Sequence, residues 1–132
     1  MFDQMAKSSP RPTDSELEIL AVLWERGPST VRDVHTALSA SKPTDYTTVL
    51  KLMQIMSEKG LVRRNETDRA HVYEARQPAE QTQRQLLRHL LDRAFNGSAS
   101  RLVMQALATR ATSREELSEI RRMLDDLGRS AS

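Results

Sequence analysis

The spacing of the apolar residues changes once within residues 13–75, after Gly60. Three consecutive segments up to Gly60 carry apolar residues three and four positions apart, whereas residues 61–64 and 69–75 are two short runs without this period that flank a polar turn. The first spacing predicts helices with one apolar side, and the second predicts a two-stranded hairpin. Three helices followed by a hairpin are the order of a winged helix-turn-helix, in which the third helix enters the DNA major groove.

Each helix has recognisable ends. Thr13 and Glu16 form a capping box at the start of the first helix, and Gly27-Pro28 ends it. Ser29 or Thr30 can cap the second helix, which the run from Ser39 to Pro43 breaks. We expect the inward face of the first helix to consist of Leu17, Leu20, Ala21 and Trp24, and that of the second to consist of Val31, Val34 and Leu38.

The third helix runs from a cap at Thr44 to Lys59-Gly60, where a cation and a residue that tolerates a left-handed turn end it. Its predicted inward stripe consists of Val49, Leu52, Met53 and Met56. At about 100° per residue, the opposite face then consists of Thr44, Thr47, Lys51, Gln54 and Glu58, with Tyr46 and Thr48 on the flanks.

That opposite face is rich in neutral hydrogen-bonding groups rather than in mixed charges. Thr offers a hydroxyl and a methyl group, Gln can pair with adenine, and Lys can reach guanine or a phosphate. The alternative is that Thr44, Thr47 and Thr48 only cap and solvate the start of a helix.

The hairpin that follows favours the DNA interpretation because its cations outnumber its acids. Its cations are Lys59, Arg63, Arg64, Arg69, His71 and Arg76, and its acids are Glu66, Asp68 and Glu74. Such a hairpin can contact the phosphate backbone and replace condensed counterions. A solvated hairpin without DNA is the alternative, and the sequence leaves open whether Arg32 contacts phosphate or faces water. The net charge of +2 decides nothing by itself.

The apolar residues of the helices need only a structural role. Trp24 is expected to anchor the core between the first and third helices, and Met53 and Met56 to fill it. The chain has no cysteine, and His35, His71 and His89 lie too far apart in sequence for a metal-ligand pair. No catalytic motif is present, so we expect neither an enzyme nor a cofactor. The N-terminal residues do not resemble a signal peptide, which predicts a cytoplasmic protein.

Residues 78–128 are predicted to form three further helices whose apolar stripes exceed what so short a segment can bury. We therefore expect a second copy of the chain to cover them. The predicted dimerisation residues are Leu86, Leu87, Leu90, Leu91, Phe95, Leu102, Val103, Leu107, Leu117, Ile120, Met123, Leu124 and Leu127. Around this region we expect a flexible arm over residues 1–12, a DNA-binding domain over residues 13–77 and a tail over residues 129–132.

Three segments together resemble the penicillinase-repressor family of winged-helix transcriptional regulators, often called BlaI/MecI. They are TDSELEILAVLW, DYTTVLKLMQIMSEKGLVRR and HVYEA, and the resemblance extends from about Pro12 to Leu127. It implies a mainly α (α+β) fold and a homodimeric repressor on a dyad-symmetric operator. The DNA contacts that it implies are Thr44, Tyr46, Thr47, Thr48, Lys51 and Gln54 on the third helix and Arg63, Arg64 and Arg69 on the hairpin.

The resemblance also implies a mode of induction. Many members are inactivated by proteolysis in the dimerisation region, triggered by a membrane sensor with a metalloprotease domain, and the matching place here is Gln105-Ala106. Cleaved members usually carry Asn-Phe there. A copper-responsive branch ends in a cysteine-rich tail, which a chain without cysteine cannot supply.

A second class of function is a winged-helix module that binds another protein rather than DNA. Such a surface should carry apolar anchors, and Thr44, Thr47, Lys51 and Gln54 provide none.

Overall fold

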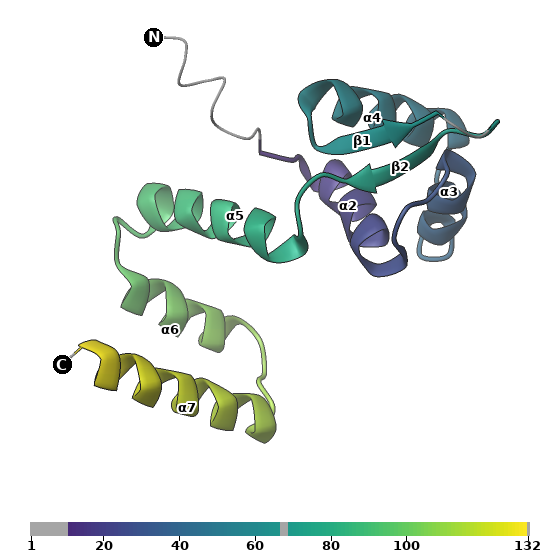
Figure 1. The fold of residues 1–132 in the computed structure, drawn as a ribbon. Helices are drawn as coiled ribbons and strands as arrows, with labels where there is room; N and C mark the ends of the chain where they lie inside the picture. Colours follow the sequence, from purple (N-terminus) through teal and green to yellow (C-terminus); the bar gives the residue numbers. More distant parts are fainter. Residues whose placement is uncertain (1–10, 67–68, 132) are drawn as a thin grey trace, which may run out of the picture. The chain divides into compact units, whose positions relative to one another are not determined.

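The computed structural model describes residues 11–66 and 69–131. Residues 1–10 of the predicted arm, Thr67 and Asp68 of the predicted turn, and Ser132 lie outside the described residues. In order, the elements are α2 (Asp14–Arg26), α3 (Val31–Ser39), α4 (Tyr46–Lys59), β1 (Val62–Asn65), β2 (Val72–Ala75), α5 (Ala79–Ala94), α6 (Ala99–Thr109) and α7 (Arg114–Ala131) (Figure 1). Contacts divide the chain into two units, residues 1–87 and 88–132.

In the first unit, α2, α3 and α4 pack around one core, and the hairpin lies beside α4 (Figure 1). β1 and β2 are antiparallel, with Val62 opposite Ala75 and Arg64 opposite Tyr73. Ser29 exchanges two backbone hydrogen bonds with Tyr73 and so ties the start of α3 to the hairpin. The buried apolar side chains are Ile19, Leu20, Leu23, Val31, Val34, Val49, Met53, Met56, Val62 and Tyr73. This is the predicted winged helix-turn-helix.

The predicted helix ends are confirmed at most positions. Thr13 and Glu16 exchange the two hydrogen bonds of a capping box, Thr30 caps α3, and α4 ends at Gly60 in the left-handed conformation. The predicted cap at Thr44 is wrong. Asp45 is the N-cap residue of α4, because the hydroxyl of Thr44 turns back to donate to the carbonyl of Lys42 at 2.9 Å.

The predicted inward face of α2 is shifted by one residue. Ile19, Leu20 and Leu23 are buried together with Glu16, whereas Ala21 is exposed and Leu17 and Trp24 are half-buried. The true buried face includes a charged residue, Glu16, in the first turn of α2, so apolar spacing alone placed the face incorrectly. The carboxylate of Glu16 is 2% exposed and lies 2.8 Å from the ammonium group of Lys59.

Two further residues have other partners than those predicted. Lys59, assigned to the cations of the hairpin, is engaged by Glu16 at the end of α4. Trp24, expected to anchor the core between the first and third helices, packs against that core but is only half-buried, and its indole N–H donates to the carbonyl of Gln77 at 2.9 Å. Trp24 therefore fixes the chain where it leaves the hairpin.

Two predicted helix ends in the C-terminal region are also confirmed. Ser113 and Glu116 form the capping box at the start of α7. Asn96 and Gly97, both with positive φ, follow the end of α5. The first turn of α5 belongs to the first unit, because Thr82 is buried and its hydroxyl donates to the side chain of Gln77. Over their described lengths, α6 and α7 contain no buried residue.

Candidate nucleic-acid interface

The two faces of α4 differ sharply in burial. Val49, Met53 and Met56 are at most 1% exposed, and Leu52 is half-buried. The predicted inward stripe is thus confirmed for Val49, Met53 and Met56, whereas Leu52 is only partly buried. On the other side, Thr47, Thr48, Lys51 and Gln54 are all exposed. These four residues form the polar face of α4, which presents two hydroxyls, an ammonium group and an amide to the surroundings.

The start of α4 is less open than its middle. Thr44 is half-buried, and its hydroxyl is engaged by the Lys42 carbonyl. Tyr46 is 42% exposed, and its ring packs edge to face on the ring of His35 at 5.5 Å between centroids. Asp45, between Thr44 and Tyr46 in the sequence, makes no capping hydrogen bond with its side chain.

The hairpin arginines Arg63 and Arg64 point to opposite faces, as successive strand residues must. Arg64 lies opposite the buried Tyr73 and shares its face of the hairpin, whereas Arg63 lies opposite Glu74 and forms an ion pair with it at 3.1 Å. Hydrogen bonding to Tyr73 is the main cause of a raised pKa for the Arg64 guanidinium, and Glu66 raises this pKa further through an ion pair. Arg64 therefore stays cationic, and its two neighbours restrain its position.

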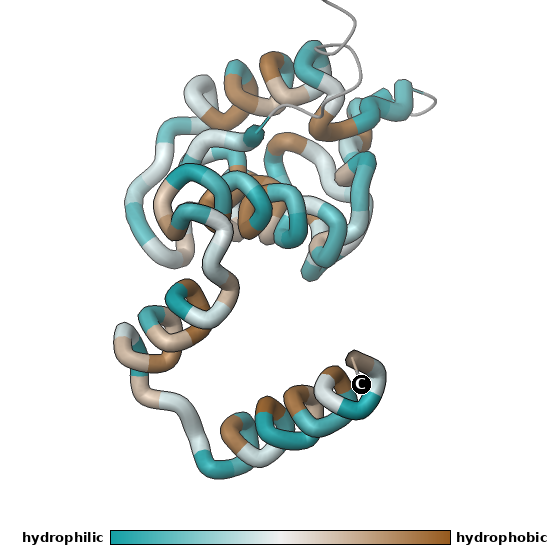
Figure 2. Tube along the Cα trace, turned by 90° about the vertical axis from the view of Figure 1, so that its left-hand side faces the viewer, coloured by the Kyte–Doolittle hydropathy of each residue, from teal (hydrophilic) through white to brown (hydrophobic). Residues whose placement is uncertain are grey.

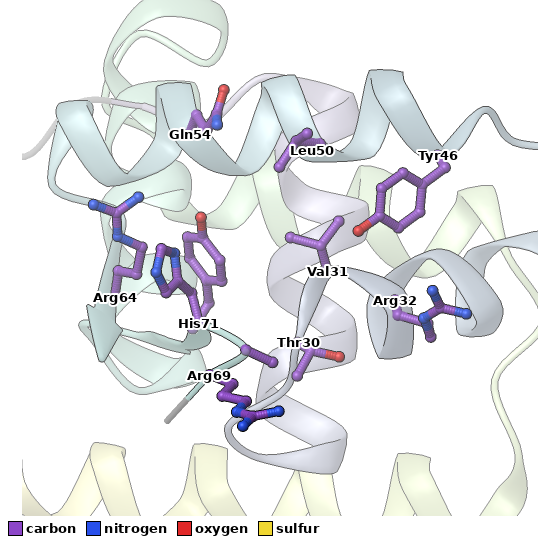
Figure 3. Close-up of a pocket in the computed structure, with 11 residues that line it drawn as sticks. Thr30, Val31, Arg32, Tyr46, Leu50, Gln54, Arg64, Arg69 and His71 are labelled. Carbon is purple, nitrogen blue, oxygen red and sulfur yellow. The ribbon is translucent and has the colours of Figure 1, made fainter. Parts of the chain in front are cut away.

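A groove of about 570 Å³ separates α4 from the hairpin. Its lining comes from α3, α4, β1, β2 and their connections: Thr30, Val31, Arg32, Tyr46, Leu50, Gln54, Arg64, Arg69, Ala70, His71 and Tyr73. Figure 3 shows Leu50 and Tyr46 extending from α4 toward the groove, and Arg64 and His71 on the hairpin side of it. Among these lining residues are three arginines and a histidine, and none is acidic.

A groove with this lining suits a polyanion. Guanidinium groups bind phosphate through paired N–H donors. The lining itself contains no carboxylate, and Arg64 has its ion pair with Glu66, which does not line the groove. The polar face of α4 adjoins the groove through Gln54, which belongs to both. Base-reading and phosphate-binding chemistry therefore lie next to each other on the first unit.

The predicted DNA contacts divide into two sets. Tyr46, Gln54, Arg64 and Arg69 line the groove. The other predicted contacts, Thr44, Thr47, Thr48, Lys51 and Arg63, do not line it. For both sets the part in DNA binding stays a prediction. From the sequence, Arg32 could either contact phosphate or face water, and neither Thr30 nor Leu50 was predicted to belong to the interface. All three line the groove. A lone arginine next to a helix cap has no distinctive pattern, so only the packing of α3 against the hairpin could place Arg32.

None of the predicted dimerisation residues is buried. Leu87, Leu90, Val103, Leu107, Met123, Leu124 and Leu127 are exposed, and Leu86, Leu91, Phe95, Leu102, Leu117 and Ile120 are half-buried. Figure 2 shows apolar and polar stretches alternating along the helix that ends at the C-terminus. Gln105 and Ala106 are exposed on α6, where the Gln105 carbonyl accepts a hydrogen bond from Thr109.

Residues 11–66 and 69–131 offer neither a metal centre nor a membrane span. In this part of the chain no three His, Asp or Glu side chains come together as metal ligands would. None of its helices combines the length and the apolar character needed to cross a bilayer.

Comparison with known proteins places these features in a family. The chain is 46% identical over 70 residues to the transcriptional regulator BlaI of Mycobacterium tuberculosis, a match that covers 52% of this chain and 50% of that protein. It therefore spans about half the length of those relatives. It is 23% identical over 120 residues to the penicillinase repressor of Bacillus licheniformis, covering 91% of this chain and 94% of that one.

A solved structure supports the fold. The chain resembles a MarR family protein from Bacillus stearothermophilus with a TM-score of 0.50 and 20% identity, over 92% of this chain and 76% of the other. At this identity the likeness concerns the fold alone. The sequence model of the penicillinase repressor family matches residues 12–126. Because that match covers most of the chain, the protein belongs to the penicillinase repressor family.

Proposed function

We propose that this protein is a DNA-binding transcriptional repressor that inserts α4 into the major groove of its operator. The observation that carries the proposal is the segregation of α4, whose apolar stripe is buried while Thr47, Thr48, Lys51 and Gln54 are exposed. Hydroxyl, ammonium and amide groups are the donors and acceptors that recognise base edges. The relatives named as a transcriptional regulator and a penicillinase repressor support the same function.

The groove beside α4 supplies the contacts to the DNA backbone. Arg32, Arg64 and Arg69 line it without a carboxylate among the lining residues, and phosphate contacts of this kind fix the register of a protein on the duplex. Arg63 lies on the other face of the hairpin and does not line the groove, so we expect it to contribute less than Arg64.

The repressor acts as a homodimer on a dyad-symmetric operator. Support comes from the exposed apolar side chains of residues 78–128, which include Leu90, Met123 and Leu124 at 45%, 63% and 56% exposure. Apolar stripes of this kind on successive helices are covered in stable proteins, and a second copy is the simplest cover. A two-fold dimer presents two copies of α4 to two half-sites.

Relief of repression through a membrane metalloprotease sensor and proteolysis near Gln105-Ala106 is the mode of induction that the family resemblance suggests. The exposure of both residues is compatible with it, although this chain lacks the usual Asn-Phe. Mass spectrometry of the chain from induced cells tests this point, and an intact chain in derepressed cells would rule it out.

Charge-removing substitutions in the interface test the proposed function. A duplex that the wild-type chain selects from a random library serves as the operator. Lys51→Ala combined with Arg64→Ala should weaken binding strongly and reduce the salt slope of log K by about one for each phosphate that the variant no longer neutralises. Fluorescence anisotropy at several salt concentrations measures both quantities.

The matched control is Arg121→Ala combined with Arg122→Ala, which removes two exposed cations from the polar side of α7. We expect this variant to bind like the wild type. Equal affinities and equal slopes for the two double variants would refute α4 and the hairpin as the DNA-binding surface. A wild-type chain that selects no duplex would favour the protein-binding alternative.

A further inference from the structure

The start of α4 differs from that of other helices in how it is held. The N-cap residues Thr13, Thr30 and Ser98 of α2, α3 and α6 each accept a hydrogen bond with their side chain from the helix backbone. Ser113 does the same before α7. The N-cap residue of α4, Asp45, makes no such bond. The helix that carries the proposed base contacts is therefore not fixed by its own cap.

A residue of the preceding helix holds this point instead. The Nε2 atom of His35, on α3, lies 2.7 Å from the backbone carbonyl oxygen of Thr44. Because a carbonyl can only accept, the ring must carry its proton on Nε2. The hydroxyl of Ser39, one turn further along α3, lies 3.3 Å from the same nitrogen. The ring of His35 also packs edge to face on Tyr46, with an angle of 77° between the planes.

The other restraints on this turn are an exposed ion pair and local hydrogen bonds. The ammonium group of Lys42 lies 3.4 Å from the carboxylate of Glu18 on α2. The backbone N–H groups of Ser41 and Lys42 donate to Leu38, and the hydroxyl of Thr44 donates to Lys42. These bonds shape the turn but do not fix residues 44–46 relative to α3. His35 connects this segment to α3 through the two residues that flank Asp45: it contacts the carbonyl of Thr44 and the ring of Tyr46. Figure 3 shows that ring extending from α4 toward Val31 at the groove.

We propose that His35 is a positioning residue for base recognition: its Nε2 hydrogen bond to the Thr44 carbonyl sets the entry of α4, and thereby the placement of Tyr46, Thr47 and Thr48 against the bases. His35 does not itself line the groove. The inference rests on the proposed function, because it assigns a role within the same DNA-binding surface. It predicts that removal of the hydrogen bond harms sequence discrimination, which depends on atomic placement, more than phosphate binding, which does not.

Three substitutions separate the hydrogen bond from the ring contact. In His35→Gln, the amide nitrogen lies as far from the backbone as Nε2 does, so it can still donate to the Thr44 carbonyl. In His35→Asn, the amide nitrogen reaches only as far as Nδ1 and falls short of that carbonyl. His35→Leu keeps apolar bulk against Tyr46 but has no donor. Thr36→Ala, at the exposed neighbouring position, is the control.

The test measures the dissociation constants of the full chain for the selected operator and for an unrelated duplex of equal length, at one salt concentration. Their ratio is the readout. A partly unfolded variant binds both duplexes more weakly by the same factor, so the ratio is insensitive to a loss of stability. Thermal unfolding of each variant accompanies the measurement.

We expect the ratio to fall by about tenfold in His35→Asn and His35→Leu, which is the discrimination that one misread base pair carries. His35→Gln and Thr36→Ala should keep the wild-type ratio. Unchanged ratios in the Asn and Leu variants, or an equal fall in the Gln variant, would overturn the role of His35. A wild-type ratio near one would instead refute the proposed function itself.

Discussion

The carboxylate of Glu16 is the charged group that the fold buries most completely among the described residues. Burial by itself raises the pKa of Glu16, but the ion pair with Lys59 and the hydrogen bonds with Thr13 outweigh it, so that the pKa lies below its ordinary value of 4.5. The same side chain accepts from the Thr13 backbone at 2.9 Å and from the Lys59 ammonium at 2.8 Å. One carboxylate thus caps α2 and ties it to the end of α4.

Replacement of Glu16 by Gln should destabilise the first unit by about 1.5–3 kcal/mol at neutral pH, the range for hydrogen bonds to charged groups. A carboxylate whose folded pKa is lowered contributes stability above its unfolded pKa and loses it as the pH falls through the folded pKa. The difference in unfolding free energy between wild type and Glu16→Gln should therefore shrink below about pH 4.5. Urea titrations at pH 7 and pH 3 measure it, and a constant difference would contradict the assignment.

The sequence predicted the local role of Glu16 but not the distant one. Thr13 and Glu16 lie three positions apart, so the capping box can be recognised from spacing alone. Lys59 lies 43 positions from Glu16, and nothing in the sequence around either residue links them. Because this pairing could not be foreseen, Lys59 was assigned to the cations of the hairpin. The buried face of α2 was predicted one residue away from its observed position, since a glutamate was not expected in it.

At the scale of elements, the link between α4 and β1 fixes how the hairpin lies beside the helix. Gly60 has φ 83° and ψ 16°, a conformation that costs other residues free energy. The backbone N–H of Leu61 donates to Met56, and that of Gly60 to Ser57, which is the pattern of a helix ended by a left-handed residue. The sequence predicted this end correctly because a lysine and a glycine close the apolar stripe.

Gly60→Ala should destabilise the protein by about 1 kcal/mol. No atom lies within 4 Å of an added Cβ, so the cost arises from the backbone conformation and not from a clash. Gly128→Ala is the matched control, because Gly128 lies inside α7 with equal space around it. There alanine should be neutral or stabilising. Thermal unfolding followed by circular dichroism distinguishes the two, and equal melting temperatures for both variants would contradict the prediction.

The placement of the groove could not be predicted at this scale. Because side chains alternate along a strand, the sequence could have shown that Arg63 and Arg64 lie on opposite faces of the hairpin. It could not show which of the two faces meets α4, because that depends on the burial of Val62 and Tyr73 in the core. Arg32 reaches the groove because α3 begins beside the hairpin, where Ser29 pairs with Tyr73. Contacts between residues this far apart in sequence follow from packing, which no local pattern reports.

At the scale of the whole molecule, the exposed apolar side chains of α5, α6 and α7 support the proposed dimer. Leu124 is 56% exposed on α7 in one chain. Burial of such a side chain contributes about 1.5–3 kcal/mol, and several of them act together in the proposed dimer. The sequence predicted that this surface exists, because the stripes exceed what the segment can cover.

Leu124→Asp should yield monomers that bind the operator weakly, because the free energy of two half-sites is no longer combined. Ser118→Asp introduces the same charge at an exposed position on the polar side of α7 and should leave the dimer intact. Sedimentation velocity measures the assembly of both variants. A dimeric Leu124→Asp chain, or a monomeric wild type, would argue against the proposed interface.

The central claim is that the polar face of α4 and the adjoining groove form the DNA-binding surface, and an NMR titration of the isotope-labelled chain with its selected operator tests it most directly. We predict the largest chemical-shift changes at residues 44–54, at Arg64 and at residues 69–71. The indole N–H of Trp24, which donates to Gln77 away from the groove lining, should change little. Large changes at Trp24 with none along α4 would contradict the claim.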